Sequence, residues 1–191
     1  QTKVSRYEYA WAFAHPFAAC KVKKIHKKLK PFYNESELKM SLDSFSQGGK
    51  LDAYRHVFYM AAFAQKIKAK KIIKLGKAHE KTNYRQFKKG KGKNTILPDS
   101  LSSIMDLWNN EIGVTLARDN KELSYEELKH KVIKLINENK AFYFLRDANG
   151  NFLDCDGKTI IDLKKYQDKW YIPKCMLGLS EKQENIMKHS D

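Results

Sequence analysis

The sequence contains little arginine, little cysteine and no long apolar run, and each shortage counts against a class of protein. Only five of the 37 basic residues are Arg, whereas proteins that read bases and phosphates rely on the bidentate guanidinium. Three cysteines cannot all pair and form no C-x-x-C spacing, so neither a disulfide framework nor a cysteine metal site is indicated. The longest apolar stretch, Val57 to Ala64, is far too short to cross a bilayer.

Two features of the sequence bear on the cellular compartment. A single bridge between Cys155 and Cys175 is compatible with an oxidising environment. The chain starts at Gln1 rather than Met, which favours a mature secreted or periplasmic form from which a signal peptide has been removed. The compartment and the state of Cys155 and Cys175 stay open at this point.

The composition is that of a folded, strongly basic protein. At 191 residues, with 42% hydrophobic and 12% aromatic residues, the chain is expected to form a single domain over 1–191. The formal charge of +15 predicts attraction to polyanions such as nucleic acid, anionic lipid or cell-envelope polymers. The Lys-rich segments 21–30 and 88–93 are the candidate contacts. The alternative is that these lysines form an ordinary solvated surface.

The hydrophobic pattern predicts a mainly α-helical fold. Apolar residues recur at three- and four-residue spacing in six segments, which are Val4 to Ala14, Phe17 to Leu29, Leu51 to Ile67, Lys70 to Phe87, Ser100 to Arg118 and Tyr125 to Asn139. The segment Leu51 to Ile67 is apolar nearly all round, which is typical of a central buried helix. Residues 31–50 are predicted to form a loop with a short helix, ending in a flexible pair, Gly48 and Gly49. The helical core is expected over about 50–118.

The period of the pattern changes after Lys140, which predicts a small β-hairpin or sheet in the C-terminal part, over about 140–175. Phe142 to Arg146 and Phe152 to Cys155 flank an Asn-Gly turn, the commonest signal for a hairpin. Thr159 to Leu163 and Trp170 to Ile172 are candidates for further strands. Residues 180–191 are predicted to be a short helix or a frayed tail.

Polar residues interrupt the predicted helices at three places, and these are the candidate site. An unpaired ionisable group costs several kcal/mol in an apolar segment, so such groups must satisfy one another or bind a ligand. The residues are Asp52, Arg55 and His56 in the first cluster, His79 and Glu80 in the second, and Asp106, Asn109 and Asn110 in the third. Because adjacent helical residues diverge by about 100°, only one of His79 and Glu80 can face the other clusters, and we expect it to be His79.

Two chemistries suit these side chains. Asp52, His56, His79 and Asp106 would together bind Zn²⁺ or another divalent ion and leave a position for water. Without a metal, His56 held by a carboxylate can act as a general base, with Arg55 and the Asn amides stabilising negative charge. No cofactor-binding fingerprint accompanies the clusters, and none of the spacings matches the H-E-x-x-H helix motif. The structural alternative is that the residues cap and tie helices together.

The three clusters lie in strings that resemble a known family. Asp52-Ala53-Tyr54-Arg55-His56, Ala78-His79-Glu80 and Asp106-Leu107-Trp108-Asn109-Asn110 are similar to the pattern D-A-x-R-H, A-H-E and D-L-x-N-N of an uncharacterised bacterial domain family. Its members occur in secreted proteins and at the C-terminal ends of large toxin-like polypeptides. The resemblance covers about residues 50–113. It implies a mainly helical domain with an enzymatic or toxin-like role.

These observations lead to one main functional hypothesis and two alternatives. The main hypothesis is a hydrolase of a phosphate-containing or cell-envelope substrate, dependent on a divalent metal such as zinc or on His56 alone. The first alternative is a non-catalytic protein that binds anionic lipid, polysaccharide or nucleic acid through its lysines. The second is a toxin or effector domain. The substrate and the oligomeric state do not follow from the sequence.

Overall fold

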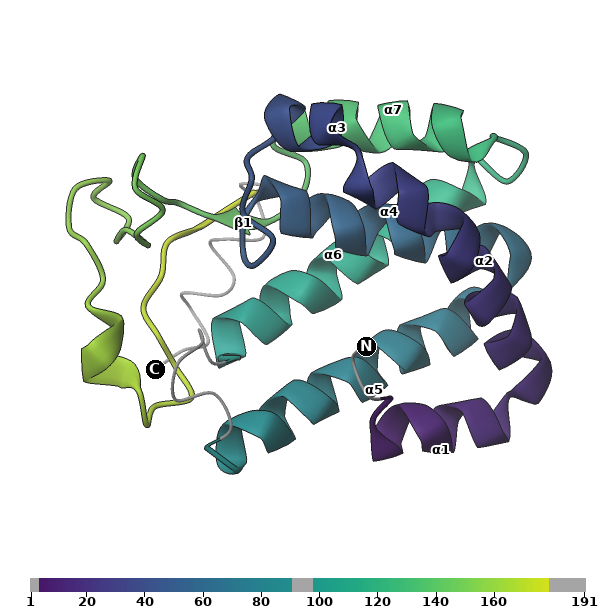
Figure 1. The fold of residues 1–191 in the computed structure, drawn as a ribbon, viewed down its shortest axis with the longest axis horizontal. Helices are drawn as coiled ribbons and strands as arrows, with labels where there is room; N and C mark the ends of the chain where they lie inside the picture. The colour runs from purple at the N-terminus through teal and green to yellow at the C-terminus, as the bar shows by residue number, and fades with distance from the viewer. Residues whose placement is uncertain (1–3, 91–97, 179–191) are drawn as a thin grey trace.

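The computed structural model describes residues 4–90 and 98–178 (Figure 1). Within these residues the chain forms seven α-helices, one short 3-10 helix and two short strands. The prediction of a mainly helical fold with a small sheet near the C-terminus is confirmed. The predicted tail at 180–191 and residues 91–93 of the basic segment 88–93 lie outside the described residues. No described helix combines the length and the apolar character that a bilayer crossing requires.

Two helices, α4 (Lys50–Lys66) and α6 (Ser100–Arg118), lie side by side at the centre of the fold (Figure 1). Most of α4 is buried, including Val57, Phe58 and Met60, as predicted for a central helix. A Cβ atom on Gly113 of α6 would lie 2.4 Å from the carbonyl oxygen of Val57 on α4. The close approach of the two backbones therefore requires glycine at position 113.

Five further helices complete the helical part of the described chain. They are α1 (Arg6–Ala14), α2 (Pro16–Asn34), α3 (Ser36–Ser41), α5 (Ala69–Lys88) and α7 (Tyr125–Asn137). The expected short helix within residues 31–50 is α3. The expected loop from Pro31 is wrong, because α2 continues through Pro31 to Asn34. Leu29 is fully buried and Phe32 packs against the core, and this burial outweighs the hydrogen bond that Pro31 cannot donate.

The helix α1 is attached firmly to α5. Its N-cap Ser5 and Glu8 form a capping box. The indole of Trp11 is buried and donates a hydrogen bond of 2.8 Å to the carbonyl oxygen of Lys71 on α5. The Thr82 hydroxyl, also on α5, donates to the Ser5 hydroxyl at 2.6 Å. These contacts fix which side of α1 faces the protein and which side faces solvent.

The C-terminal part is less regular than the predicted hairpin. The strands β1 (Tyr143–Phe144) and β2 (Met176–Leu177) pair antiparallel, and the hairpin around Asn149-Gly150 is reduced to the single bridge between Arg146 and Phe152. The predicted strand Trp170 to Ile172 is wrong. The predicted strand Thr159 to Leu163 contributes only a bridge between Ile160 and Leu153, and it runs into the 3-10 helix η1 (Leu163–Tyr166).

A second apolar cluster explains why the strands of the C-terminal part pair over so few residues. Phe142, Phe144, Phe152 and Met176 are buried together with Leu101 and Met105 of α6, so side-chain burial against a helix, rather than an extended ladder, holds these segments. A disulfide joins Cys155 to Cys175, with 4.8 Å between the Cα atoms. This bridge was one of the options left open by the sequence.

Candidate functional site

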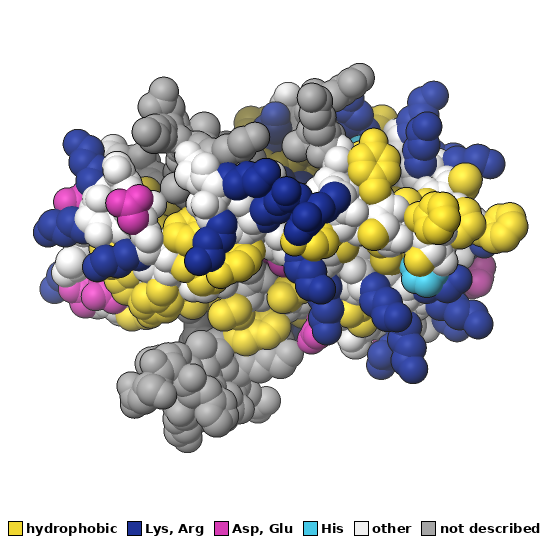
Figure 2. Space-filling view, turned by 90° about the horizontal axis from the view of Figure 1, so that it is seen from below, with side chains coloured by type: hydrophobic (Ala, Val, Ile, Leu, Met, Phe, Trp, Pro, Cys, Tyr) yellow, Lys and Arg dark blue, Asp and Glu magenta, His cyan; other side chains and the backbone are white. Residues whose placement is uncertain are grey.

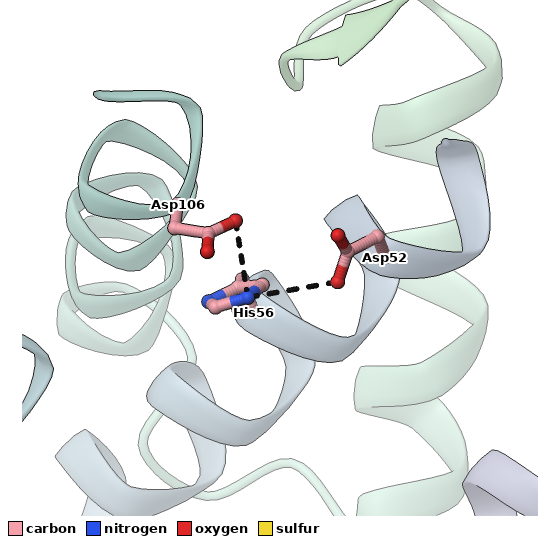
Figure 3. Close-up of side chains that lie close together, drawn as sticks. All are labelled: Asp52, His56 and Asp106. Atoms are coloured by element: carbon pink, nitrogen blue, oxygen red, sulfur yellow. Dashed lines mark ion pairs between the residues drawn. The ribbon is translucent and has the colours of Figure 1, made fainter. Parts of the chain in front are cut away.

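The polar residues of α4 and α6 meet where the first turns of the two helices face each other (Figure 3). Asp52 and His56 lie one turn apart on α4, and Asp106 points at them from α6. One ligand atom from each of these side chains lies within 4.8 Å of the other two. The structure thus brings together three of the four residues that were expected to lie side by side, and all three side chains are nearly buried.

The two ring nitrogens of His56 have different surroundings: Nδ1 is hydrogen-bonded to an amide, and Nε2 lies among ionisable side chains. Its Nδ1 lies 3.0 Å from Oδ1 of Asn110, on the next turn of α6 from Asp106. A carbonyl oxygen can only accept, so Nδ1 carries the proton and the neutral ring has its lone pair on Nε2. Nε2 lies 3.2 Å from Oδ1 of Asp106, 3.6 Å from Oδ1 of Asp52 and 3.2 Å from Nη2 of Arg55.

Burial determines the charge state of His56. It lowers the pKa of the imidazole, while the neighbouring Asp52 carboxylate opposes that shift. Since the unperturbed pKa of histidine is about 6.5, the ring is neutral at pH 7. His56 therefore presents an unprotonated Nε2, the form that a general base or a metal ligand needs.

Asp52 is fixed from two sides. Its Oδ2 accepts a hydrogen bond of 2.6 Å from the backbone N–H of Gly48, and its Oδ1 forms an ion pair of 2.5 Å with Nη2 of Arg55. Gly48 has a φ of +72°, and a Cβ there would lie 2.7 Å from the Phe144 ring. Gly48 and Gly49 are buried, so the expected flexible glycine pair is instead a fixed turn that aims an N–H at Asp52.

Asp106 and Glu80 are carboxyl groups that hold protons unusually tightly. Burial and the nearby Asp52 charge raise the pKa of Asp106 well above its ordinary value. Burial and the charge of Asp106 raise the pKa of Glu80 to about 7. A carboxyl group with a raised pKa can act as a general acid.

The structure corrects the expectation that His79 faces the cluster. Nδ1 of His79 lies 3.0 Å from Oε1 of Glu8 on α1, and 49% of its side chain is exposed. Glu80 is the buried residue of the pair and adjoins Asp106. The prediction that only one of His79 and Glu80 faces the cluster agrees with the structure, but the expectation that it is His79 was wrong. The position of α1, which supplies the partner of His79, could not be found from the sequence.

Asn109 belongs to the fold rather than to the cluster. Its amide nitrogen donates to the carbonyl oxygen of Phe142 at 2.8 Å, and its oxygen accepts from the Phe142 N–H at 2.9 Å. Both polar atoms of this fully buried side chain are thus used to attach the segment before β1 to α6. Its neighbour Asn110 orients His56, so the two adjacent asparagines have different roles.

Gly76 on α5 makes room for Asn110, a contact that the sequence did not reveal. A Cβ at position 76 would lie 2.7 Å from Nδ2 of Asn110. Any larger residue would press on the amide that anchors the imidazole of His56. The glycine was visible in the sequence three residues before His79, but only the packing of α5 on α6 shows its use.

A second buried polar cluster, formed by Asp99, Ser102 and Lys174, was missed by sequence reasoning. Nζ of Lys174 lies 2.6 Å from Oδ2 of Asp99 and 2.8 Å from Oγ of Ser102, and the Lys174 and Asp99 side chains are each 1% exposed. Asp99 also caps α6 by accepting from the Ser102 N–H. In the sequence, Lys174 is a single lysine among apolar residues, and such a lysine is easily assigned to the solvent-exposed surface.

The two buried clusters differ in how completely their atoms are paired. Lys174 and Asp99 form short, well-directed hydrogen bonds with each other. Oδ1 of Asp52 has the guanidinium of Arg55 as its ion-pair partner, whereas Oδ1 of Asp106 is buried without a well-directed hydrogen bond, 3.2 Å from Nε2 of His56. Structural polar networks in proteins are almost always satisfied. An unsatisfied buried oxygen is therefore a candidate position for a ligand or a reacting group.

The donor set also fits a divalent metal ion. The Nε2 to oxygen distances of 3.2 and 3.6 Å bracket the ~3.3 Å that separates two ligands of tetrahedral Zn²⁺ with bonds of about 2.0–2.1 Å. His79, the fourth predicted ligand, is not part of this set. Arg55 already neutralises Asp52, so an ion would have to displace the guanidinium from that oxygen.

A cavity elsewhere in the molecule does not involve these residues. It has a volume of about 440 Å³ and lies between the start of α1 and the last turns of α5, where Tyr7, Thr82 and Arg85 line it. The Asp52, His56 and Asp106 side chains are not among its walls.

The fold and the site define a mainly helical protein with a buried His-Asp-Asp cluster between two central helices. The chain belongs to the family described as Domain of unknown function (DUF6973), whose family model matches residues 9–140. The match contains the whole cluster and extends well beyond residues 50–113, where the resemblance was noticed. No match was found among curated proteins or among solved structures.

Proposed function

We propose that the protein is a hydrolase of an anionic substrate, phosphate-containing or from the cell envelope, with His56 as its general base. The observation that supports this proposal is the pairing of His56: Asn110 anchors Nδ1, while Nε2 faces the partly exposed guanidinium of Arg55 and Oδ1 of Asp106, a buried oxygen that lacks a well-directed hydrogen bond. A histidine that served only to tie α4 to α6 would need neither the buried, unpaired oxygen of Asp106 nor a partly exposed guanidinium beside Nε2.

In the proposed reaction, Asp106 is the acid and His56 is the base. Water loses a proton to Nε2 of His56, and the water oxygen bonds to the electrophilic phosphorus or carbon. The bond to the leaving-group oxygen breaks, and that oxygen takes the proton of Asp106, which is held by the raised pKa of this carboxyl group. The proton on His56 then returns to Asp106 across their 3.2 Å contact, which restores the starting state.

Arg55 is the proposed contact for the substrate. Its side chain is 41% exposed, whereas those of His56 and Asp106 are about one-tenth exposed. In the free protein its Nη2 lies beside Nε2 of His56. An anionic group of the substrate would draw the guanidinium outward and free the lone pair of His56. The net charge of +15 favours the approach of such a substrate.

The test compares histidine variants on defined probes. The probes are bis(4-nitrophenyl) phosphate, 4-nitrophenyl phosphate and purified peptidoglycan. On a probe that the protein hydrolyses, we expect His56→Gln and Asp106→Asn to lower kcat/KM by about 100-fold or more, the range typical of a lost acid or base. His79→Gln is the matched control, since it removes an imidazole outside the cluster, and its activity should stay within about threefold of that of the parent protein.

Two results would contradict this proposal. One is a folded His56→Gln protein, verified by circular dichroism, that hydrolyses a probe as fast as the parent. The other is a parent protein that hydrolyses none of the three probes, which would remove the phosphate and cell-envelope substrates and leave the non-catalytic alternative.

A divalent ion is the second candidate mechanism, favoured by the spacing of the donor atoms. Asp52, His56 and Asp106 would hold the ion, which would supply an activated water in place of the histidine base. Elemental analysis of the purified protein and calorimetric titration with Zn²⁺ after EDTA treatment separate the two mechanisms. One equivalent of metal that is lost in His56→Gln but retained in His79→Gln would favour the ion, and hydrolysis that survives EDTA treatment would favour the metal-free reaction.

A further inference from the structure

The solvent-facing side of α1 and the start of α2 carry exposed aromatic side chains that need an explanation. Tyr9, Phe13 and Phe17 are 63%, 91% and 86% exposed. They recur every four residues, across the break at His15 where α1 ends and α2 begins. Single exposed apolar residues are common on proteins, but a row of aromatic rings is typical of an interaction surface.

This exposure follows from how α1 is attached, and it is not a sign of loose packing. Trp11 points to the opposite side of α1, where it is buried and bonded to Lys71 of α5. Glu8, which pairs with His79, points to that side as well. Because the polar and buried contacts of α1 fix its rotation, Tyr9 and Phe13 are held in solvent.

Lysines continue the same surface along α2. Cys20, Lys21, Lys24 and Lys28 follow Phe17 at helical spacing and are all exposed. We call this set, from Tyr9 to Lys28, the aromatic–lysine surface. Figure 2 shows hydrophobic side chains gathered at the right-hand end of the molecule, over α1 and the start of α2, with Lys and Arg side chains around them.

The charge of the segment that carries this surface has one sign. Between Glu8 and Glu35 the sequence contains six lysines and no acidic residue. Exposed aromatic rings beside lysines are the combination that an interfacial helix presents to a membrane, where the rings enter the boundary between headgroups and acyl chains and the ammonium groups reach lipid phosphates. A nucleic-acid site would be expected to use arginine, and the segment between these two glutamates contains none.

We propose that the aromatic–lysine surface binds the protein peripherally to membranes that contain anionic phospholipids. The aromatic side chains insert at the interface, and Lys21, Lys24 and Lys28 contact the headgroups. The surface shares no residue with the Asp52, His56 and Asp106 cluster, so the proposal stands or falls independently of the hydrolase function.

The experiment is co-sedimentation of the full chain with sucrose-loaded vesicles, either of phosphatidylcholine alone or of phosphatidylcholine with 30% phosphatidylglycerol. We expect binding to the anionic vesicles and little to the neutral ones. Phe13→Ser with Phe17→Ser should weaken binding by about 10-fold or more, since two aromatic rings no longer insert. Replacing Lys21, Lys24 and Lys28 by Gln should weaken it by about fivefold per lysine.

Matched controls come from the C-terminal part, which lies at the opposite end of the molecule (Figure 1). Ile160→Ser with Tyr171→Ser removes two side chains that are each 54% exposed. Replacement of the exposed Lys164, Lys165 and Lys169 by Gln removes the same charge as the α2 triple variant. Both controls should bind the anionic vesicles like the parent protein.

A second measurement uses Cys20, the cysteine that is not in the disulfide. A polarity-sensitive fluorophore on Cys20 should shift to shorter wavelength with anionic vesicles, because Cys20 lies within the surface that meets the lipid. The proposal is overturned if the control variants lose as much binding as the surface variants, or if the label does not shift. It is also overturned if the aromatic variants instead abolish a dimer seen by ultracentrifugation or the binding of a DNA duplex.

Discussion

At the scale of single residues, the completeness of hydrogen bonding separates structural polar groups from candidate functional ones. Asn109 uses both polar atoms on the backbone of Phe142, so its burial is explained by the fold. Oδ1 of Asp106 is equally buried and has no well-directed partner. The two residues lie three positions apart on one helix, so position in the sequence alone could not distinguish their roles.

Glu80 yields a prediction about pH and stability. Its folded-state pKa of about 7 lies above the ordinary value of 4.5, so the folded protein holds this proton more tightly than the unfolded chain. Stability is therefore lost as pH rises from about 4.5 through 7. In Glu80→Gln this loss is absent, and between pH 4.5 and pH 8 the variant should gain up to ~3 kcal/mol in unfolding free energy relative to the parent.

Urea unfolding of both proteins across this pH range measures the effect. Glu111→Gln, a substitution at an exposed position of the same kind of residue on α6, is the control. A difference between Glu80→Gln and the parent that stays constant from pH 4.5 to pH 8 would contradict the shifted pKa of Glu80.

At the scale of elements, helix packing decides which polar residues become neighbours. Asp52 and Asp106 approach because Gly113 allows the backbones of α4 and α6 to come close. His79 faces α1 because Ser5, Glu8 and Trp11 attach that helix to α5. The start of α6 is fixed in turn by Asp99, which caps the helix and binds Lys174.

Lys174 is predicted to be essential for anchoring the C-terminal part to α6. Lys174→Met leaves the buried carboxylate of Asp99 without its cation, and removing one partner of a buried pair costs about 3–5 kcal/mol. The double variant with Asp99→Asn should recover part of this loss, since the amide oxygen can still cap α6. Thermal or urea unfolding measures both effects, with Lys164→Met, at an exposed position, as the control. A loss below about 1 kcal/mol in Lys174→Met would contradict a structural role for this ion pair.

At the scale of the whole molecule, α6 links the two apolar clusters. Ile112 packs against both the cluster around α4 and the cluster around Phe142 and Phe144. Trp170, in the C-terminal part, contacts Tyr84 and Phe87 of α5. Elements that share this many contacts are expected to lose their structure together.

The prediction of a single domain can be tested through this coupling. In Trp11→Phe, fluorescence reports only on Trp108, which packs on Phe142, and on Trp170, which contacts Tyr84 and Phe87. Far-UV circular dichroism reports on all the helices. In urea, the two signals of this variant should give one common midpoint. Midpoints separated by more than ~0.5 M would mean that the C-terminal part unfolds as a separate unit.

The sequence by itself determined the helical class, most helix positions and the residues of the cluster. Period and polarity are local properties, so α4 could be recognised as a buried helix and Asp52, His56 and Asp106 as polar groups that must find partners. The continuation of α2 through Pro31 and the pairing of β1 with β2 could not be foreseen, because burial of distant side chains outweighed local turn and strand preferences.

Only the tertiary structure decided how the polar residues divide between folding and chemistry. The contacts of His79 with α1, of Asn109 with Phe142 and of Gly76 with Asn110 join segments far apart in the chain. Whether an ionisable side chain is satisfied depends on the three-dimensional positions of these partners. Local spacing fixes which residues share a helix face, whereas the packing of one helix on another fixes what that face meets.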